Sequence, residues 1–400
     1  MNVVGIIAEY NPMHNGHIYH INQAKKQANA DYVIVIMSGA FTEQGNVAVI
    51  NKMKRAEIAI QNGADMVIEL PSIFAVSSSE TFAYGAINIL NSLNVVTHLA
   101  FGAECENISL LQDVAKTYHE HEQEILLSIK DKMKEGINSA AAYSQIMQNH
   151  LPNISEDIFL PNNILAVQYL KALYALKSEI KPILIHRLKS NHSDTKLCDT
   201  CEYASSTSIR EVLCNTSLDE KEKMQKISKV APENTINYLV KSSYTTNEDL
   251  WNILKYAITK LGVSGLKEIQ EVSEGLENKI YSSALKSNSY NDFIFNVKSK
   301  RYTLSRIKRI CVYILLGITK KTYANLKNVN YARILKIKDE SSNLLSLINT
   351  NSKIPIITKI TDEILNRLDS TLKESIQLDI LSTNISNTDE PNIDYLNRIK

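Results

Sequence analysis

The sequence predicts an α/β fold, in which helices cover a parallel sheet, followed by a mainly α-helical segment. Short apolar runs rich in Val and Ile alternate with helical patterns through residues 1–215. Strands that are apolar on both faces are typical of a parallel sheet buried between helices. From about residue 216 to residue 400 the pattern is mostly helical, with no recognisable repeat. We therefore expect two domains, residues 1–215 and 216–400.

The predicted strands follow one another along the first domain. The first strand is the apolar run that ends in Gly5-Ile6-Ile7-Ala8-Glu9-Tyr10. The further predicted strands are Tyr32–Met37, Met66–Leu70, Val95–Phe101 and Ile183–Ile185. The charged, helical stretch 107–151 is interpreted as an insertion between two strands of this domain, and Pro161 begins the next helix. Ligands bind at the carboxyl ends of parallel strands, so the polar residues directly after these runs should line one rim.

Composition, charge and cysteine content exclude several classes of protein. The chain has 400 residues, of which 44% are hydrophobic, and a net charge of +1, so nothing attracts it generally to nucleic acid or membranes. No apolar run reaches the roughly 18 residues of a membrane span, and no basic signal region precedes the first strand. Five cysteines, an odd number, fit a reducing cytoplasm. We expect a cytoplasmic protein without membrane contact, and no feature indicates a protein partner.

The first functional signal is the break after the first strand. Asn11-Pro12 cannot continue a central strand or a helix, so the chain must turn there. His14-Asn15-Gly16-His17 follows and opens a helical pattern. Glycine lets a phosphate group approach the backbone, and the free N–H groups at a helix start attract anions. The segment predicts a nucleotide site with both imidazoles beside a phosphate. The alternative is that the histidines only cap the helix.

The second signal is Ser205-Ser206-Thr207-Ser208-Ile209-Arg210, which begins a helix after the fifth predicted strand. Taken alone, the stretch is interpreted as an ordinary N-cap, with Glu211 completing a turn that resembles a capping box. It lies at the opposite end of the same α/β domain from the first motif. The resemblance given next favours nucleotide binding by the two motifs together.

These motifs resemble those of known enzymes. The spacing His-x-Gly-His is typical of the adenylyl-transferring superfamily that includes class I aminoacyl-tRNA synthetases and small nucleotidyltransferases. The second motif resembles one of nucleotidyltransferases, except that Ala204 replaces an Ile. Most of the chain resembles one family, the bacterial tRNA(Met) cytidine acetate ligases. The matching segments are Gly5–His20, Met37–Phe41, Arg55–Glu57, Gly63–Pro71, Phe82–Ala86, Phe101–Glu104, Pro161–Leu165 and Ser205–Arg210.

The resemblance implies a Rossmann-like nucleotidyltransferase domain that binds ATP, followed by a mainly helical domain that binds tRNA. It implies that His14 and His17 are catalytic and stabilise charge on the α-phosphate, while hydroxyl groups and Arg210 hold the β- and γ-phosphates. The implied ATP-binding residues are Ile7, Ala8, Glu9, Tyr10, Asn11, Pro12, Met13, His14, Asn15, Gly16, His17, Ile18, Tyr19, His20, Gly102, Asn162, Arg187, Ser205, Ser206, Thr207 and Arg210.

The activity implied by the resemblance has two steps. Acetate attacks the α-phosphate of ATP, with Mg²⁺ neutralising the leaving pyrophosphate, and acetyl-adenylate forms. The N4 amine of the wobble cytidine of elongator tRNA(Met) then takes the acetyl group, giving N4-acetylcytidine. Acetate is already an anion, so no nucleophilic side chain is needed, and we expect no metal ligands in the protein itself. Two other functions stay open: a small-molecule adenylyltransferase of the same fold, and a non-enzymatic RNA-binding scaffold.

One turn departs from the pattern of the resembled family. After Phe41 the family usually has Gln-Arg-Gly, whereas this chain has Glu43-Gln44-Gly45 and so lacks a positive charge at the rim. We expect Lys52 or Arg55 to compensate for the missing charge.

The densest positive segment runs from Lys298 to Arg309, immediately before an apolar helix. Basic side chains there could follow a phosphate backbone, and a tyrosine could stack on a base. The alternative is the solvated start of an amphipathic helix, but a similar stretch in the resembled family favours RNA. The candidate tRNA-binding residues are Lys298, Lys300, Arg301, Tyr302, Arg306 and Arg309, with Tyr331 and Arg333 as secondary candidates.

Cys198-x-x-Cys201, with His186 and His192 upstream, has the residue types of a zinc site. A structural zinc site normally has a second close pair of ligands, and this pair lies in a polar segment. A loop without metal is the favoured interpretation.

Overall fold

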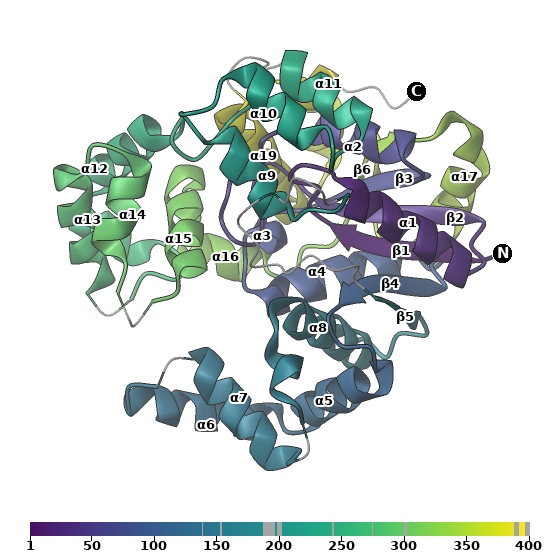
Figure 1. The fold of residues 1–400 in the computed structure, drawn as a ribbon, viewed down its shortest axis with the longest axis horizontal. Coiled ribbons are helices and arrows are strands. Elements are labelled where there is room, and N and C mark those ends of the chain that lie inside the picture. The colour runs from purple at the N-terminus through teal and green to yellow at the C-terminus, as the bar shows by residue number, and fades with distance from the viewer. Residues whose placement is uncertain are drawn as a thin grey trace.

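The computed structural model describes residues 1–137, 139–152, 154–186, 197, 202–241, 244–273, 275–299, 302–387 and 392–396. In this part of the chain, seven strands form one sheet at the centre of the molecule (Figure 1). The strands are β1 (Val3–Ala8), β2 (Tyr32–Ser38), β3 (Met66–Leu70), β4 (His98–Ala103), β5 (Lys181–His186), β6 (Ala332–Ile337) and β7 (Ile356–Ile357). Their order is β5-β4-β1-β2-β3-β6-β7, and the β3–β6 pair is antiparallel in an otherwise parallel sheet. The predicted fold class is confirmed.

Helices fill most of the remaining structure. Those before β5 are α1 (Asn15–Gln27), α2 (Lys52–Gln61), α3 (Ser72–Ala75), α4 (Ser79–Ser92), α5 (Ile108–Glu120), α6 (Glu122–Lys134), α7 (Ser139–His150) and α8 (Pro161–Ala175). Those after β5 are α9 (Ser206–Leu213), α10 (Glu220–Ile227), α11 (Glu233–Lys241), α12 (Trp251–Glu268), α13 (Leu276–Lys286), α14 (Tyr290–Val297), α15 (Leu304–Leu316), α16 (Lys320–Leu326), α17 (Ser342–Asn351), α18 (Asp362–Arg367), α19 (Ser370–Ser386) and α20 (Ile393–Leu396). Short 3-10 helices occupy Glu156–Phe159 and Asp339–Ser341. Within the described ranges, no helix is both long enough and apolar enough to cross a bilayer.

Both faces of the sheet are buried, which explains why the central strands β1 and β2 are almost entirely apolar. In β2, Val33 and Val35 pack on the face that α1, α2 and α9 cover. Ile34 and Ile36 pack on the opposite face, under α4 and α8. A strand with helices on both sides needs apolar side chains at every position, not only at alternate ones.

The first five strands lie where the sequence predicted them, except that β1 already ends at Ala8 and β4 is shifted. This strand begins at His98 and ends at Ala103, whereas the prediction was Val95–Phe101. The chain leaves α4 through Asn94, which has a left-handed φ of 56°. The two valines that follow belong to this connection, so pairing with β1 starts only at His98.

The segment 216–400 is mostly helical, as expected, but it also completes the sheet. β6 lies antiparallel to β3, with Ile337 opposite Met66, and β7 pairs with β6. The sequence analysis did not expect either strand. Residues on both sides of position 215 therefore share one sheet, and β3 has a partner on each side.

Two groups of helices extend from the sheet layers (Figure 1). Helices α5, α6 and α7 form the predicted insertion between β4 and β5. Helices α12, α13, α14 and α15 form a second group, in which α12 packs against α13 and α15. α15 also contacts the main body, because the hydroxyl of Tyr313 donates to the backbone oxygen of Val76 at 2.6 Å.

Candidate active site

Two adjoining cavities open at the carboxyl ends of the parallel strands. The β4 cavity has a volume of about 170 Å³ and lies beside Phe101 and Gly102. The α9 cavity has a volume of about 220 Å³ and lies beside Ser206, Thr207 and Arg210. The cavities share part of their walls, so they form one continuous site. The residues that line both are Ile7, Ala8, Tyr10, His14, His17, Asn162, Leu165 and Tyr169.

His14 and His17 cap the start of α1 and line both cavities. Nδ1 of His14 accepts the backbone N–H of Gly16 at 3.1 Å, and Nδ1 of His17 accepts that of His14 at 3.3 Å. Because each Nδ1 is an acceptor, a neutral imidazole here has its proton on Nε2. The two rings stack with their centroids 3.7 Å apart. An added Cβ at Gly16 would lie 3.0 Å from Cε1 of His14, so glycine makes room for that ring. His14 and His17 therefore both cap the helix and line the cavities.

The two predicted motifs meet in space although about 190 residues separate them. The hydroxyl of Ser206 donates to the backbone oxygen of Pro12 at 3.2 Å. Nη1 of Arg210 donates to the backbone oxygen of Asn11 at 2.7 Å. Ser205 is the N-cap of α9, and its hydroxyl accepts the backbone N–H of Ser208 at 3.0 Å. Ser208 completes this capping turn, and not Glu211 as in the N-cap interpretation of the sequence.

The start of α8 is oriented by a carboxylate that follows β4. Glu104 accepts a hydrogen bond from the side-chain amide of Asn162 and another from the backbone N–H of Asn163, the latter at 3.0 Å. Oδ1 of Asn163 accepts the backbone N–H groups of Glu104 and Cys105, each at 2.9 Å. Asn163 is fully buried, whereas Asn162 lines both cavities. The β4–α8 junction therefore presents Asn162 to the site.

The structure brings most of the predicted ATP-binding residues together. Those that line a cavity are Ile7, Ala8, Glu9, Tyr10, Asn11, His14, Gly16, His17, Tyr19, His20, Gly102, Asn162, Ser205, Ser206, Thr207 and Arg210. Pro12, Met13, Asn15 and Ile18 line neither cavity; Met13, for example, is buried in the core. Arg187 lies outside the described residues.

The sequence analysis did not identify the apolar walls of the site. These walls include Phe101, Leu165, Tyr169, Ile185 and Tyr203. Leu165 and Tyr169 follow Asn162 by three and seven residues, a spacing that puts them on one face of α8. Helical periodicity was therefore a usable signal for these two. Tyr203 lies 6.3 Å from the ring of Tyr19, and no local pattern indicates that contact.

Two carboxylates, those of Glu9 and Glu43, line the α9 cavity together with the hydroxyl groups and Arg210. Oε1 of Glu9 accepts the backbone N–H of Glu43 at 2.7 Å. Burial raises the pKa of Glu9. Burial, and then the charge of Glu9, raise the pKa of Glu43 to about 7. In the described ranges, no group of three or more His, Cys, Asp or Glu side chains could hold a metal ion alone. Two carboxylates do suit Mg²⁺, which takes its other ligands from phosphate and water.

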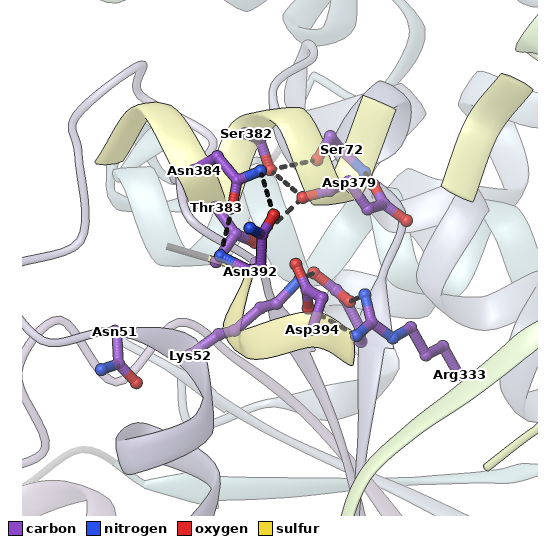
Figure 2. Close-up of polar contacts among 12 residues, drawn as sticks. Asn51, Lys52, Ser72, Arg333, Asp379, Ser382, Thr383, Asn384, Asn392 and Asp394 are labelled. Carbon is purple, nitrogen blue, oxygen red and sulfur yellow. Dashed lines mark hydrogen bonds and ion pairs between the residues drawn. The ribbon is translucent and has the colours of Figure 1, made fainter. Parts of the chain in front are cut away.

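Neither Lys52 nor Arg55 replaces the charge that is missing at the rim, so that expectation is wrong. Lys52 is fully buried and binds Glu69 at 2.6 Å. It also binds Asp394 at 2.9 Å (Figure 2). Arg55 is also fully buried and donates to backbone oxygens, including that of Glu9 at 2.6 Å. Burial lowers the pKa of Arg55 to about 10. Both cations hold the ends of strands in place and do not line either cavity.

The basic segment before α15 is only partly exposed. Tyr302 and Arg309 are each 9% exposed. Nη2 of Arg309 pairs with Glu271 at 3.0 Å, and the guanidinium of Arg306 lies 4.9 Å from the ring centroid of Tyr302. Burial therefore contradicts RNA contact by these two residues. The ring of Tyr302 is covered, and Glu271 neutralises the charge of Arg309. Lys298 is exposed and Arg306 is half-buried.

The remaining candidates of the sequence analysis divide into two groups. Tyr331 and Arg333 are buried at 0% and 3% exposure, so their proposed RNA contacts are wrong as well. Lys300, Arg301, His192, Cys198 and Cys201 lie outside the described residues. His186 lines the β4 cavity, and its Nε2 lies 3.6 Å from Oε1 of Glu106.

Comparison with known proteins agrees with this geometry. A family model described as HIGH nucleotidyl transferase matches residues 1–397. The tRNA(Met) cytidine acetate ligase of Clostridium perfringens is 36% identical over 410 residues, which cover 99% of this chain and 98% of that protein. The protein of the same name from Acetivibrio thermocellus is 34% identical over 399 residues, which cover 96% of this chain and 94% of that protein.

Solved structures are similar over nearly the whole chain. Thermotoga maritima TmcAL bound with α-thio ATP has a TM-score of 0.88 and 29% identity, over 99% of this chain and 96% of that one. The apo form of the same protein has a TM-score of 0.89. A chain with these two motifs around one site, matched over its full length, belongs to the HIGH nucleotidyl transferase family and, within it, to the tRNA(Met) cytidine acetate ligases.

Proposed function

We propose that the protein is an ATP-dependent ligase that activates acetate as acetyl-adenylate and transfers the acetyl group to N4 of the wobble cytidine of elongator tRNA(Met). The observation that supports this most is the meeting of His14-Asn15-Gly16-His17 and Ser205–Arg210 at one pair of cavities. The names of the similar proteins supply the carboxylate and the RNA. An enzyme that acts on tRNA would work in the cytoplasm.

The two cavities match the two ends of ATP. The β4 cavity has aromatic walls for the adenine, with the rings of Phe101 and Tyr169 6.1 Å apart. The α9 cavity has hydroxyl groups and the guanidinium of Arg210 for the β- and γ-phosphates. The α-phosphate then lies at the shared wall, beside His14 and His17.

The first step is an in-line displacement at the α-phosphate. A carboxylate oxygen of acetate forms the new bond to phosphorus, and the bond to pyrophosphate breaks. Nε2–H groups of His14 and His17 would donate to the α-phosphate oxygens, whose negative charge must be stabilised in the transition state. Arg210 would hold the leaving pyrophosphate. Glu9 and Glu43 would hold the Mg²⁺ that accompanies ATP, and this ion would neutralise charge on the phosphates.

The second step transfers the acetyl group to RNA. The N4 amine of cytidine attacks the acetyl carbonyl, the bond to AMP breaks, and the amine loses a proton. A cytidine amine is a weak nucleophile, which is why a mixed anhydride serves as the acyl donor. Lys298 and Arg306, together with Lys300 and Arg301, are our candidates for contacts with the RNA phosphates.

Exchange of labelled pyrophosphate into ATP tests the first step separately. The purified protein is assayed with acetate, propionate, glycine or no carboxylate, each with and without bulk tRNA. We expect exchange that depends on acetate, and a loss of roughly 100-fold in His17→Ala, because one donor to the α-phosphate is removed. Bound ATP without exchange for any carboxylate would contradict the proposal and favour a small-molecule adenylyltransferase or an RNA-binding scaffold.

A further inference from the structure

Two cations lie beside the α9 cavity with neutral partners. Arg210 donates to the backbone oxygen of Asn11 at 2.7 Å and to Oγ1 of Thr207 at 3.1 Å. Lys308 donates to Oδ1 of Asn46 at 2.9 Å. Among the residues that the structure describes, neither cation has a carboxylate within ion-pair distance. Positive charge is therefore available at this edge of the cavity.

Lys308 approaches the α9 cavity from the helical segment and lies directly behind its wall. Its ammonium group contacts Asn46, which lines the α9 cavity together with Arg210. Nδ2 of Asn247 donates to the same oxygen of Asn46 at 3.2 Å and orients that amide. Burial lowers the pKa of Lys308, and the charge of Arg210 lowers it further. The charge of Glu211 opposes this shift, and Glu9 acts in the same way on Arg210. An anion that binds beside both cations would offset the remaining cost of placing the two positive charges here.

The backbone, and not only a flexible side chain, places Lys308 at this edge. Gly45 has a φ of +74°, and a Cβ there would lie 2.4 Å from the carbonyl carbon of Lys308. α15 therefore packs directly on the turn Thr42–Asn46. The next residue on α15, Arg309, is held by both oxygens of Glu271, which fixes the rotation of the helix.

The turn under α15 contains Gln44, an uncharged residue that lines the α9 cavity. We propose that Lys308 and Arg210 together bind the terminal phosphates of ATP, so that the helical segment supplies part of the adenylation site. This inference rests on the proposed function and deepens it, because it assigns a phosphate-binding residue from outside residues 1–215. The groups bound are the β- and γ-phosphates that leave as pyrophosphate.

Calorimetric titration with ATP and with AMP tests this assignment. Lys308→Ala is expected to weaken ATP binding roughly 10-fold, because a charge-assisted hydrogen bond is lost. AMP binding is expected to stay unchanged, since AMP lacks the terminal phosphates. Lys308→Arg keeps the charge and should retain most of the ATP affinity, which separates loss of charge from loss of fold. Lys286→Ala, an exposed lysine of α13, is the matched control and should bind both nucleotides normally.

Three other results have distinct meanings. Equal losses of ATP and AMP affinity would overturn the inference, because Lys308 would then act on the shape of the cavity. Unchanged ATP affinity with weaker tRNA binding would also overturn it and place Lys308 on the RNA surface. If the wild-type protein binds ATP but shows no acetate-dependent exchange, the proposed function fails, while the comparison of ATP with AMP still decides the role of Lys308.

Discussion

Several side chains at the rim of the site bind the local backbone and also face the cavities. His14 and His17 satisfy backbone N–H groups at the start of α1 through Nδ1, and the same bonds fix which ring nitrogen is the donor. Glu9 accepts the backbone N–H of Glu43 and thereby holds a second carboxylate in the α9 cavity. The cost of that arrangement is electrostatic, because two buried carboxylates lie close together.

Glu43→Gln is expected to stabilise the protein above pH 7. The pKa of Glu43 is about 7 in the folded state and 4.5 in the unfolded chain, so the folded state binds more protons between these values. Wild-type stability should therefore fall as the pH rises from about 4.5 to 7, and the variant should lack this decline. We expect the free energy of unfolding of the variant to exceed that of the wild type by about 1–2 kcal/mol at pH 8, after allowance for the partial exposure of Glu43.

Urea unfolding of the nucleotide-free protein at pH 4.5 and pH 8 measures this effect. Glu179→Gln, at an exposed site, is the control and should not change the pH dependence. A Glu43→Gln variant with the same decline as the wild type would show that Glu43 titrates normally.

At the scale of elements, the contact between α15 and the turn Thr42–Asn46 joins the helical segment to the catalytic rim. The contact is close because Gly45 has no side chain. Asn46 accepts hydrogen bonds from two residues of the helical segment, Asn247 and Lys308. A change in this turn should therefore affect both the cavity and the packing of α15.

Gly45→Ala is expected to destabilise the protein by about 3 kcal/mol or more. The residue has a left-handed φ of +74°, and the new Cβ would lie 2.4 Å from backbone of α15. Gly136→Ala separates these causes, because φ there is +92° but nothing lies within 4 Å of the added Cβ. This control substitution should lower the free energy of unfolding by only about 1 kcal/mol. Equal changes in the unfolding free energy of the two variants would mean that α15 shifts and accommodates the added methyl group at little cost.

Local signals explain why the nucleotide site was predictable and parts of the helical segment were not. β1 and the start of α1 have an apolar run, a proline and a glycine within a few residues of one another, and the start of α9 has adjacent hydroxyl groups and an arginine. β6 lacks such signals, because Arg333 and Lys336 interrupt its apolar pattern and its partner Glu69 lies 264 residues from Arg333. The burial of Arg309 likewise depends on Glu271, 38 residues away.

At the scale of the whole molecule, a buried group of charges connects distant parts of the chain. Asp394 of α20 binds Lys52 of α2 and Arg333 of β6 (Figure 2). Glu69 of β3 binds the same two cations. All four side chains are at most 3% exposed. Removing one partner leaves an uncompensated charge in the interior. Asp394 thus makes α20 part of the structural core.

Asp394→Asn is expected to destabilise the protein by about 3–5 kcal/mol at pH 7. Burial alone would raise the pKa of Asp394, but Lys52 and Arg333 lower it from 3.8 to about 2. Its contribution should therefore be complete above about pH 4 and be lost as the pH falls toward 2, where wild type and variant should converge. Chemical denaturation across this range measures the difference. Glu363→Gln, in an exposed ion pair with Arg367, should have little effect. A similar loss in both variants would contradict a special role for burial.

The late position of β6 in the chain has a consequence for synthesis on the ribosome. Residues 1–210 carry both nucleotide motifs, but the outer edge of β3 gains its partner only when residues 332–337 have left the exit tunnel. An unpaired edge of a buried sheet is a place where nascent chains associate with one another. We expect chains that stall before this point to need chaperone protection, and ATP-consuming activity to arise only after the last quarter of the chain has emerged.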